Sequence, residues 1–108
     1  MTLAEQALEL LKDTGNTPDE MYDFFLRQGI KGKRCDPALC PCGTYLQEKL
    51  GQTIFVFNMV ISEKKYSLLE DNDTIKNRNE KIIVDTTDAI RLFVERFDAE
   101  SYPELIEI

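Results

Sequence analysis

Apolar residues at the start of the chain recur at the spacing of one face of a helix. The series runs Leu3, Ala7, Leu8, Leu10 and Leu11, with charged residues between them. Because residues three and four apart share a helix face, this spacing predicts an amphipathic helix over residues 2–14. Gly15 follows at the position where a helix commonly ends.

A second helix is predicted from the residues that would begin it. Thr17, Pro18 and Glu20 take the N-cap, N1 and N3 positions of a capping box. The apolar residues that follow point inward at helical spacing, and the helix is expected to end near Gly29.

A third helix is predicted to begin at Pro41 and to end at Gly51, since apolar residues between them recur at spacings of three and four. Residues 30–39 are rich in glycine, proline and charge. We expect a loop there, with one helical turn opened by Asp36 and Pro37.

A run of β-branched and aromatic residues gives the strongest strand signal. Residues 53–61 read TIFVFNMVI, whose apolar density predicts one strand covered on both faces. Residues 66–69 are the expected partner strand, residues 70–80 an exposed polar excursion, and residues 81–85 a third short strand.

The last helix is expected over residues 88–97, capped by Thr86 or Thr87. Its apolar stripe consists of Ile90, Phe93, Val94 and Phe97. Helices followed by strands and a final helix predict an α+β fold. We expect N-terminal helices, a small antiparallel sheet of about three strands and a C-terminal helix around one core, in a single domain spanning residues 1–108.

The composition is that of an acidic globular protein without histidine. Of the 108 residues, 43% are hydrophobic and 31% charged, and 20 acidic against 13 basic residues give a net charge of −7. This charge repels phosphate backbones, so general nucleic-acid binding is not expected. Without the commonest general base and metal ligand, we expect no catalysis by this chain and no cofactor.

The sequence predicts neither a membrane-spanning segment nor a secretory signal. No stretch approaches the roughly 20 apolar residues that a membrane span needs. The N-terminus lacks the basic head and apolar stretch of a secretory signal. We therefore expect a cytoplasmic protein that does not enter a membrane.

A basic segment interrupts the acidic chain. It contains four cations and no acid: Arg27, Lys31, Lys33 and Arg34. Two glycines nearby expose backbone N–H groups, so the segment is suited to hold a phosphate or an acidic partner. No phosphate-binding fingerprint is present, and a solvated loop is the alternative interpretation.

Three cysteines, Cys35, Cys40 and Cys42, fall within eight positions. A structural zinc site takes four Cys or His ligands, and the chain offers no His and no fourth Cys. Cys40 precedes a predicted helix N-terminus, which stabilises a thiolate, so a redox role is an alternative. We favour a structural role without bound metal, with Cys42 on the apolar face of the third helix.

Short motifs are spread along the chain: GIKG at 29–32, CP at 40–41, YL at 45–46, RFD at 96–98 and YPEL at 102–105. This pattern resembles that of small bacterial proteins, chiefly from actinobacteria, to which no activity is assigned. The resemblance implies a bacterial or phage setting and no catalytic residue. Only the Cys40–Pro41 step belongs to that pattern, so Cys35 and Cys42 depart from it.

Function is predicted here by elimination. We expect a small acidic protein that binds a macromolecular partner, most readily another protein, as a regulatory or accessory factor. The basic segment is the expected contact. The alternative is a thiol-based metal-binding or redox protein that uses Cys40 with Cys35 or Cys42. The oligomeric state is left open.

Overall fold

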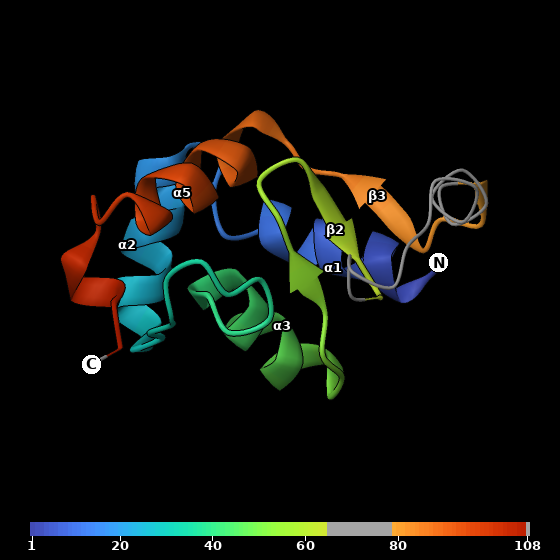
Figure 1. Cartoon of the computed structure of the whole chain (residues 1–108), viewed down its shortest axis with the longest axis horizontal. Coiled ribbons are helices and arrows are strands. Elements are labelled where there is room, and N and C mark those ends of the chain that lie inside the picture. Colours follow the sequence, from blue (N-terminus) through green and yellow to red (C-terminus); the bar gives the residue numbers. More distant parts are fainter. Residues whose placement is uncertain (65–78, 108) are drawn as a thin grey trace.

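The computed structural model describes residues 1–64 and 79–107 of the chain. Its elements in chain order are α1 (Leu3–Lys12), α2 (Pro18–Gln28), α3 (Pro41–Leu50), β1 (Phe55–Val56), β2 (Val60–Ser62), β3 (Ile83–Asp85), α5 (Asp88–Asp98) and the 3₁₀ helix η2 (Pro103–Leu105) (Figure 1). The predicted α+β fold is confirmed, and each predicted helix is present within two residues of its expected ends. No helix in this part of the chain is long and apolar enough to cross a membrane.

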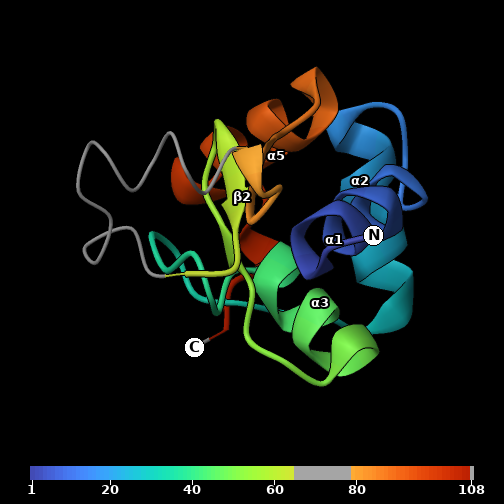
Figure 2. The ribbon, with the colours of Figure 1, turned by 90° about the vertical axis from the view of Figure 1, so that its right-hand side faces the viewer.

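The sheet forms one layer and the helices another. Its strands lie in the order β1-β2-β3, and both neighbouring pairs are antiparallel. Helix α1 packs against β2 and β3, and α3 packs against α1 and β1. Figure 2 shows α1, α2 and α3 together on one side of the strands. Helix α5 packs on α2 and extends the helical layer.

The register of the sheet decides which strand residues enter the core. Val56 lies opposite Ile61, so both point to the same face. Both are almost fully buried in the main core, where they join aromatic rings from the α2–α5 pair: Phe25, Phe93 and Phe97. The core therefore lies between the sheet and the helices.

The predicted strand over residues 53–61 is wrong as a single element, because the run folds back into the β1–β2 hairpin. Phe57 N–H donates to the Val60 carbonyl at 2.8 Å, which places Asn58 and Met59 in the turn. Thr86 holds that turn, since its hydroxyl donates to the Asn58 carbonyl at 2.7 Å. The predicted burial on both faces is found in β2, whose three residues are all buried, but not in β1, where Phe55 is only half-buried.

The other strand predictions have different outcomes. The third strand is confirmed in its last three residues, Ile83–Asp85. The partner strand expected at 66–69 and most of the polar excursion expected at 70–80 lie outside the described residues. The antiparallel three-stranded sheet is confirmed, but two of its strands come from the segment predicted to be one.

Helix α2 begins at its predicted cap, although the capping box is incomplete. The Thr17 hydroxyl accepts a hydrogen bond from Glu20 N–H at 3.1 Å. The Glu20 carboxylate accepts from Asn16 N–H at 2.9 Å, one residue before the position that a capping box requires. The complete box lies at α1, between Thr2 and Glu5.

Thr17→Ala should lower the free energy of unfolding by about 1 kcal/mol, because Glu20 N–H would lose its partner. Urea denaturation followed by circular dichroism measures the change. Thr53→Ala is the matched control, since Thr53 is exposed and lies outside any helix. Equal midpoints for the two variants would mean that the cap contributes nothing.

Candidate functional site

Residues 30–40 form the loop that carries most of the predicted site. Its first half lies against the C-terminal segment: Gly32 N–H donates to the Leu105 carbonyl at 2.9 Å, and the Gly32 carbonyl accepts from Glu107 N–H at 2.8 Å. Lys33 N–H donates to the Leu39 carbonyl at 2.8 Å, so the loop also closes on itself. These bonds place Lys33 and Leu39 side by side.

The second half of the loop is a single helical turn, as predicted. The Asp36 carbonyl accepts from Cys40 N–H at 2.8 Å. The Asp36 side chain accepts from Ala38 N–H at 3.1 Å, an arrangement that favours a turn over a longer helix. The turn leads directly into Pro41 and helix α3.

The structure divides the four predicted cations into two groups. Arg27 forms an ion pair with Asp23, one turn earlier on α2. Arg34 pairs with Glu100 at 2.7 Å and donates two hydrogen bonds to the Asp98 carbonyl, at 3.0 and 2.9 Å. These two arginines therefore already have anionic or carbonyl partners within the chain.

Lys31 and Lys33 differ from the arginines. Both side chains are exposed, and within residues 1–64 and 79–107 neither forms an ion pair. Exposed lysines of this kind keep their charge available to an approaching anion. The part of the basic segment that is available for binding is therefore these two lysines.

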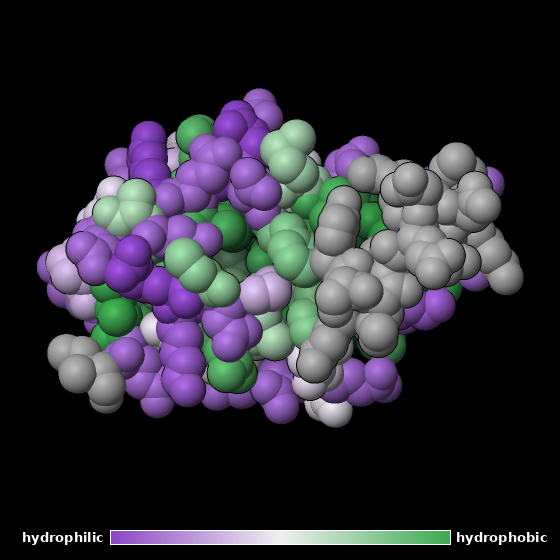
Figure 3. Space-filling view, in the orientation of Figure 1, coloured by the Kyte–Doolittle hydropathy of each residue, from purple (hydrophilic) through white to green (hydrophobic). Residues whose placement is uncertain are grey.

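A groove of about 640 Å³ with a mixed lining lies next to the loop, and Asp36, Gln47 and Thr53 are its polar side chains. The loop contributes Pro37, Ala38 and Leu39 to its wall, and β1 contributes Phe55. Leu39 is 39% exposed, so its side chain is open to contact with another molecule. Figure 3 shows apolar side chains gathered over the β1–β2 hairpin, with hydrophilic side chains over the neighbouring loop.

The three cysteines occupy different surroundings. Cys40 is the N-cap of α3, where its sulfur accepts a hydrogen bond from Gly43 N–H at 3.4 Å. Cys42 is completely buried among the core residues, which confirms its predicted place on the apolar face of α3. Cys35 is exposed, and its backbone has a left-handed φ of 56°.

Cys40 and Cys42 influence each other's ionisation. The Cys42 thiol donates a hydrogen bond that lowers the pKa of Cys40, and Gly43 N–H acts in the same direction against the effect of burial. Burial raises the pKa of Cys42 well above its ordinary value, and the bond to Cys40 raises it further. Cys40 is therefore the thiol of this pair that ionises first.

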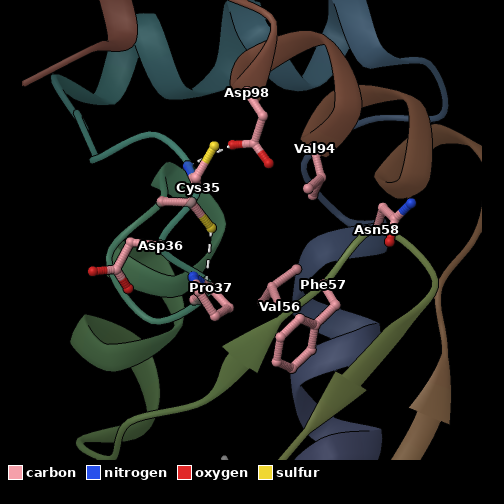
Figure 4. A pocket seen from close by; sticks show the side chains of 9 residues that line it. Cys35, Asp36, Pro37, Val56, Phe57, Asn58, Val94 and Asp98 are labelled. Carbon is pink, nitrogen blue, oxygen red and sulfur yellow. Dashed lines mark hydrogen bonds between the residues drawn. The ribbon is translucent and has the colours of Figure 1, made fainter. Parts of the chain in front are cut away.

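Cys35 and Cys40 line one cavity of about 280 Å³, and Cys42 is not among its lining residues. The cavity lies where the loop, β1 and the end of α5 meet, with Val56 and Val94 among the apolar residues of its wall. Figure 4 shows Asp98 beside Cys35, and the Cys35 N–H donates to the Asp98 carboxylate at 2.9 Å.

Metal coordination receives no geometric support from the described residues. They contain no group of three or more cysteine, aspartate, glutamate or histidine side chains placed to hold one ion. The three thiols are thus not gathered around one point, as a structural metal site would require.

Comparison with known proteins identifies no relative. No family model matches the chain, and neither a curated protein nor a solved structure shows significant similarity to it. The resemblance to small bacterial proteins therefore stays a prediction.

Sequence reasoning did not identify the acidic side of the site. Asp98 is the last residue of α5 and Glu100 lies two residues after it, and both meet the loop from more than 60 positions away in the sequence. The only signal was the RFD motif at 96–98, which carried no assigned role. Such pairings depend on how α5 and the loop pack together.

Proposed function

We propose that this chain binds a macromolecular partner through the loop–hairpin surface, which consists of Lys31, Lys33, Leu39 and Phe55. The expected contact is a protein segment that carries both acidic and apolar side chains. The observation that supports this most is the backbone hydrogen bond from Lys33, a cation without an ion pair in the described residues, to Leu39, which lines the groove.

Charge favours an acidic protein segment. The chain has a net charge of −7, so most of its surface repels an acidic partner. Two exposed lysines on one loop reduce that repulsion locally and orient the approach, against the carboxylates of Asp36 in the groove and of Glu48 and Glu107 in the hollow that Lys31 lines. A nucleic acid meets the same overall repulsion over a much longer length, which makes it the weaker candidate.

The groove adds affinity that charge alone does not supply. Burial of apolar surface contributes about 25 cal/mol per Å², whereas exposed charge pairs contribute little each. Leu39 and Phe55 are exposed in part and line one groove. A partner segment with an apolar anchor and a neighbouring carboxylate would use both features together.

We place this activity in the cytoplasm of a bacterial or phage setting, as a regulatory or accessory role without catalysis or a cofactor. The four residues of the loop–hairpin surface include no pair of acid and base side chains.

Lys31→Glu combined with Lys33→Glu should weaken binding of the partner at least about tenfold, on the order of 1.4 kcal/mol. The partner is first captured with the wild-type chain from an extract of the native host, and its dissociation constant is then measured at low and high salt. The loss should shrink as salt increases, because screening removes the electrostatic share. Arg34 is left intact because it anchors the end of α5.

Lys64→Glu with Lys81→Glu is the control for this experiment. Both lysines are exposed, both lie between β2 and β3 in sequence, and the charge change is the same. The control should bind nearly as tightly as the wild type. Equal losses in the two double variants, or full binding by Lys31→Glu/Lys33→Glu with unchanged circular dichroism, would contradict the proposal.

A further inference from the structure

We propose that Cys35 and Cys40 form a redox-active dithiol, in which Cys35 attacks a low-molecular-weight disulfide and Cys40 resolves the product into an intramolecular disulfide. The inference does not depend on the proposed function. It rests on the cavity that the two residues share and on their unequal exposure.

Cys35 is the thiol that an external reagent can reach. It is exposed at the cavity, whereas Cys40 is 3% exposed and Cys42 is 0% exposed. Its left-handed φ of 56° is unfavourable for any residue with a side chain. The Asp98 carboxylate holds this backbone by accepting its N–H (Figure 4). The Arg34 guanidinium in turn donates to the Asp98 carbonyl.

Cys40 has the properties of a resolving thiol. Its sulfur lies at the N-terminus of α3, where it accepts from Gly43 N–H at 3.4 Å and, as a thiol, donates to the Pro37 carbonyl at 3.8 Å. The unpaired N–H groups of a helix N-terminus stabilise a thiolate. The hydrogen bond from Cys42 lowers the pKa of Cys40 as well. Because Cys40 is buried, it reaches other molecules poorly, but it lines the same cavity as Cys35.

Cys42 is excluded as the partner of Cys40 on two grounds. It does not line the cavity and is completely buried in the core. It also stands two positions from Cys40 at the start of a helix, where a disulfide would have strained geometry. Burial raises the pKa of Cys42, so it remains a thiol and a hydrogen-bond donor.

The chemistry balances with glutathione disulfide as the oxidant. The Cys35 thiolate attacks one sulfur of that disulfide, its S–S bond breaks, and a mixed disulfide forms while one glutathione thiolate leaves. The Cys40 thiolate then attacks the Cys35 sulfur and displaces the second glutathione. Two protein thiols are oxidised to one disulfide, and one glutathione disulfide is reduced to two thiols.

The reduced full-length chain is incubated with glutathione disulfide, quenched with acid, alkylated and analysed by mass spectrometry. The wild type should lose two of its three alkylatable thiols and yield a peptide linking Cys35 to Cys40. Cys40→Ser should instead stop at a mixed disulfide on Cys35. Cys42→Ser is the matched control and should still form the Cys35–Cys40 link.

The inference is overturned if the wild type stops at the mixed disulfide, if the link joins Cys40 to Cys42, or if no thiol reacts. Circular dichroism establishes that each variant is folded. Should Cys40→Ser fail to fold, Cys35→Ser provides the second test, since its two buried thiols should then resist glutathione disulfide. Rapid modification of Cys40 in that variant would equally contradict the assigned order of attack.

Discussion

Phe93→Ala should lower the free energy of unfolding by about 3–5 kcal/mol. The side chain is completely buried, and its ring centroid lies 5.3 Å from that of Phe25 and 5.4 Å from that of Tyr102. Alanine would leave a cavity at the point where α2, α5 and the C-terminal segment meet. Because domains of this size are commonly stable by about 5–15 kcal/mol, the loss is a large share of the total.

Urea denaturation of the purified chain measures this effect. Phe93→Leu is the conservative variant and should lose only about 1 kcal/mol, since it keeps most of the apolar volume. Phe24→Ala is a second comparison, because Phe24 is half-buried at the edge of the same aromatic cluster. If Phe93→Ala were no less stable than Phe24→Ala, the assignment of Phe93 to the centre of the core would be wrong.

The starts of the helices were predictable because local interactions decide them. Thr17 and Pro18 fix the start of α2, and Pro41 fixes the start of α3, within a few residues of chain. The same reasoning placed Cys40 at a helix N-terminus and Cys42 in the core, and both placements are confirmed. Neither required knowledge of what the helices pack against.

The β1–β2 hairpin was not predictable in the same way. The run over residues 53–61 is rich in β-formers at nearly every position, so propensity alone continues the strand through Asn58 and Met59. The reversal is held by Thr86, which stands 28 positions after Asn58. A contact across that distance leaves no periodic signal in the sequence.

The ion pairs of the candidate site were also not predictable, because they join residues far apart in the sequence. The cluster of four cations is visible in the sequence, but the ion pair between Arg34 and Glu100 joins residues 66 positions apart. Folding therefore reduces the available charge of the segment to Lys31 and Lys33. The pairing of Cys35 with the Asp98 carboxylate, 63 positions away, was hidden for the same reason.

Gly43→Ala should lower the free energy of unfolding by about 3 kcal/mol, the upper end of the usual cost of adding a carbon atom to a tightly packed site. A Cβ at this position would lie 2.4 Å from the Ala38 carbonyl oxygen and 2.8 Å from that of Pro37. Both atoms belong to the backbone, so no side-chain rotation relieves the contact. Helix propensity acts in the opposite direction, since alanine in a helix interior is favoured over glycine by about 1 kcal/mol.

Urea denaturation distinguishes the two effects, with Gln47→Ala as the control. Gln47 is exposed on the same helix, so alanine there should leave stability unchanged or raise it slightly.

The clash at Gly43 would also push residues 37–38 away from α3 and open the cavity that Cys40 lines, so alkylation of Cys40 should become faster. A Gly43→Ala variant that is more stable than the wild type and equally slow to alkylate would show that the turn does not pack closely on α3. Pro37 and Ala38 line the groove and Pro37 also lines the cavity of Cys35 and Cys40, so close packing at Gly43 positions part of the wall of both.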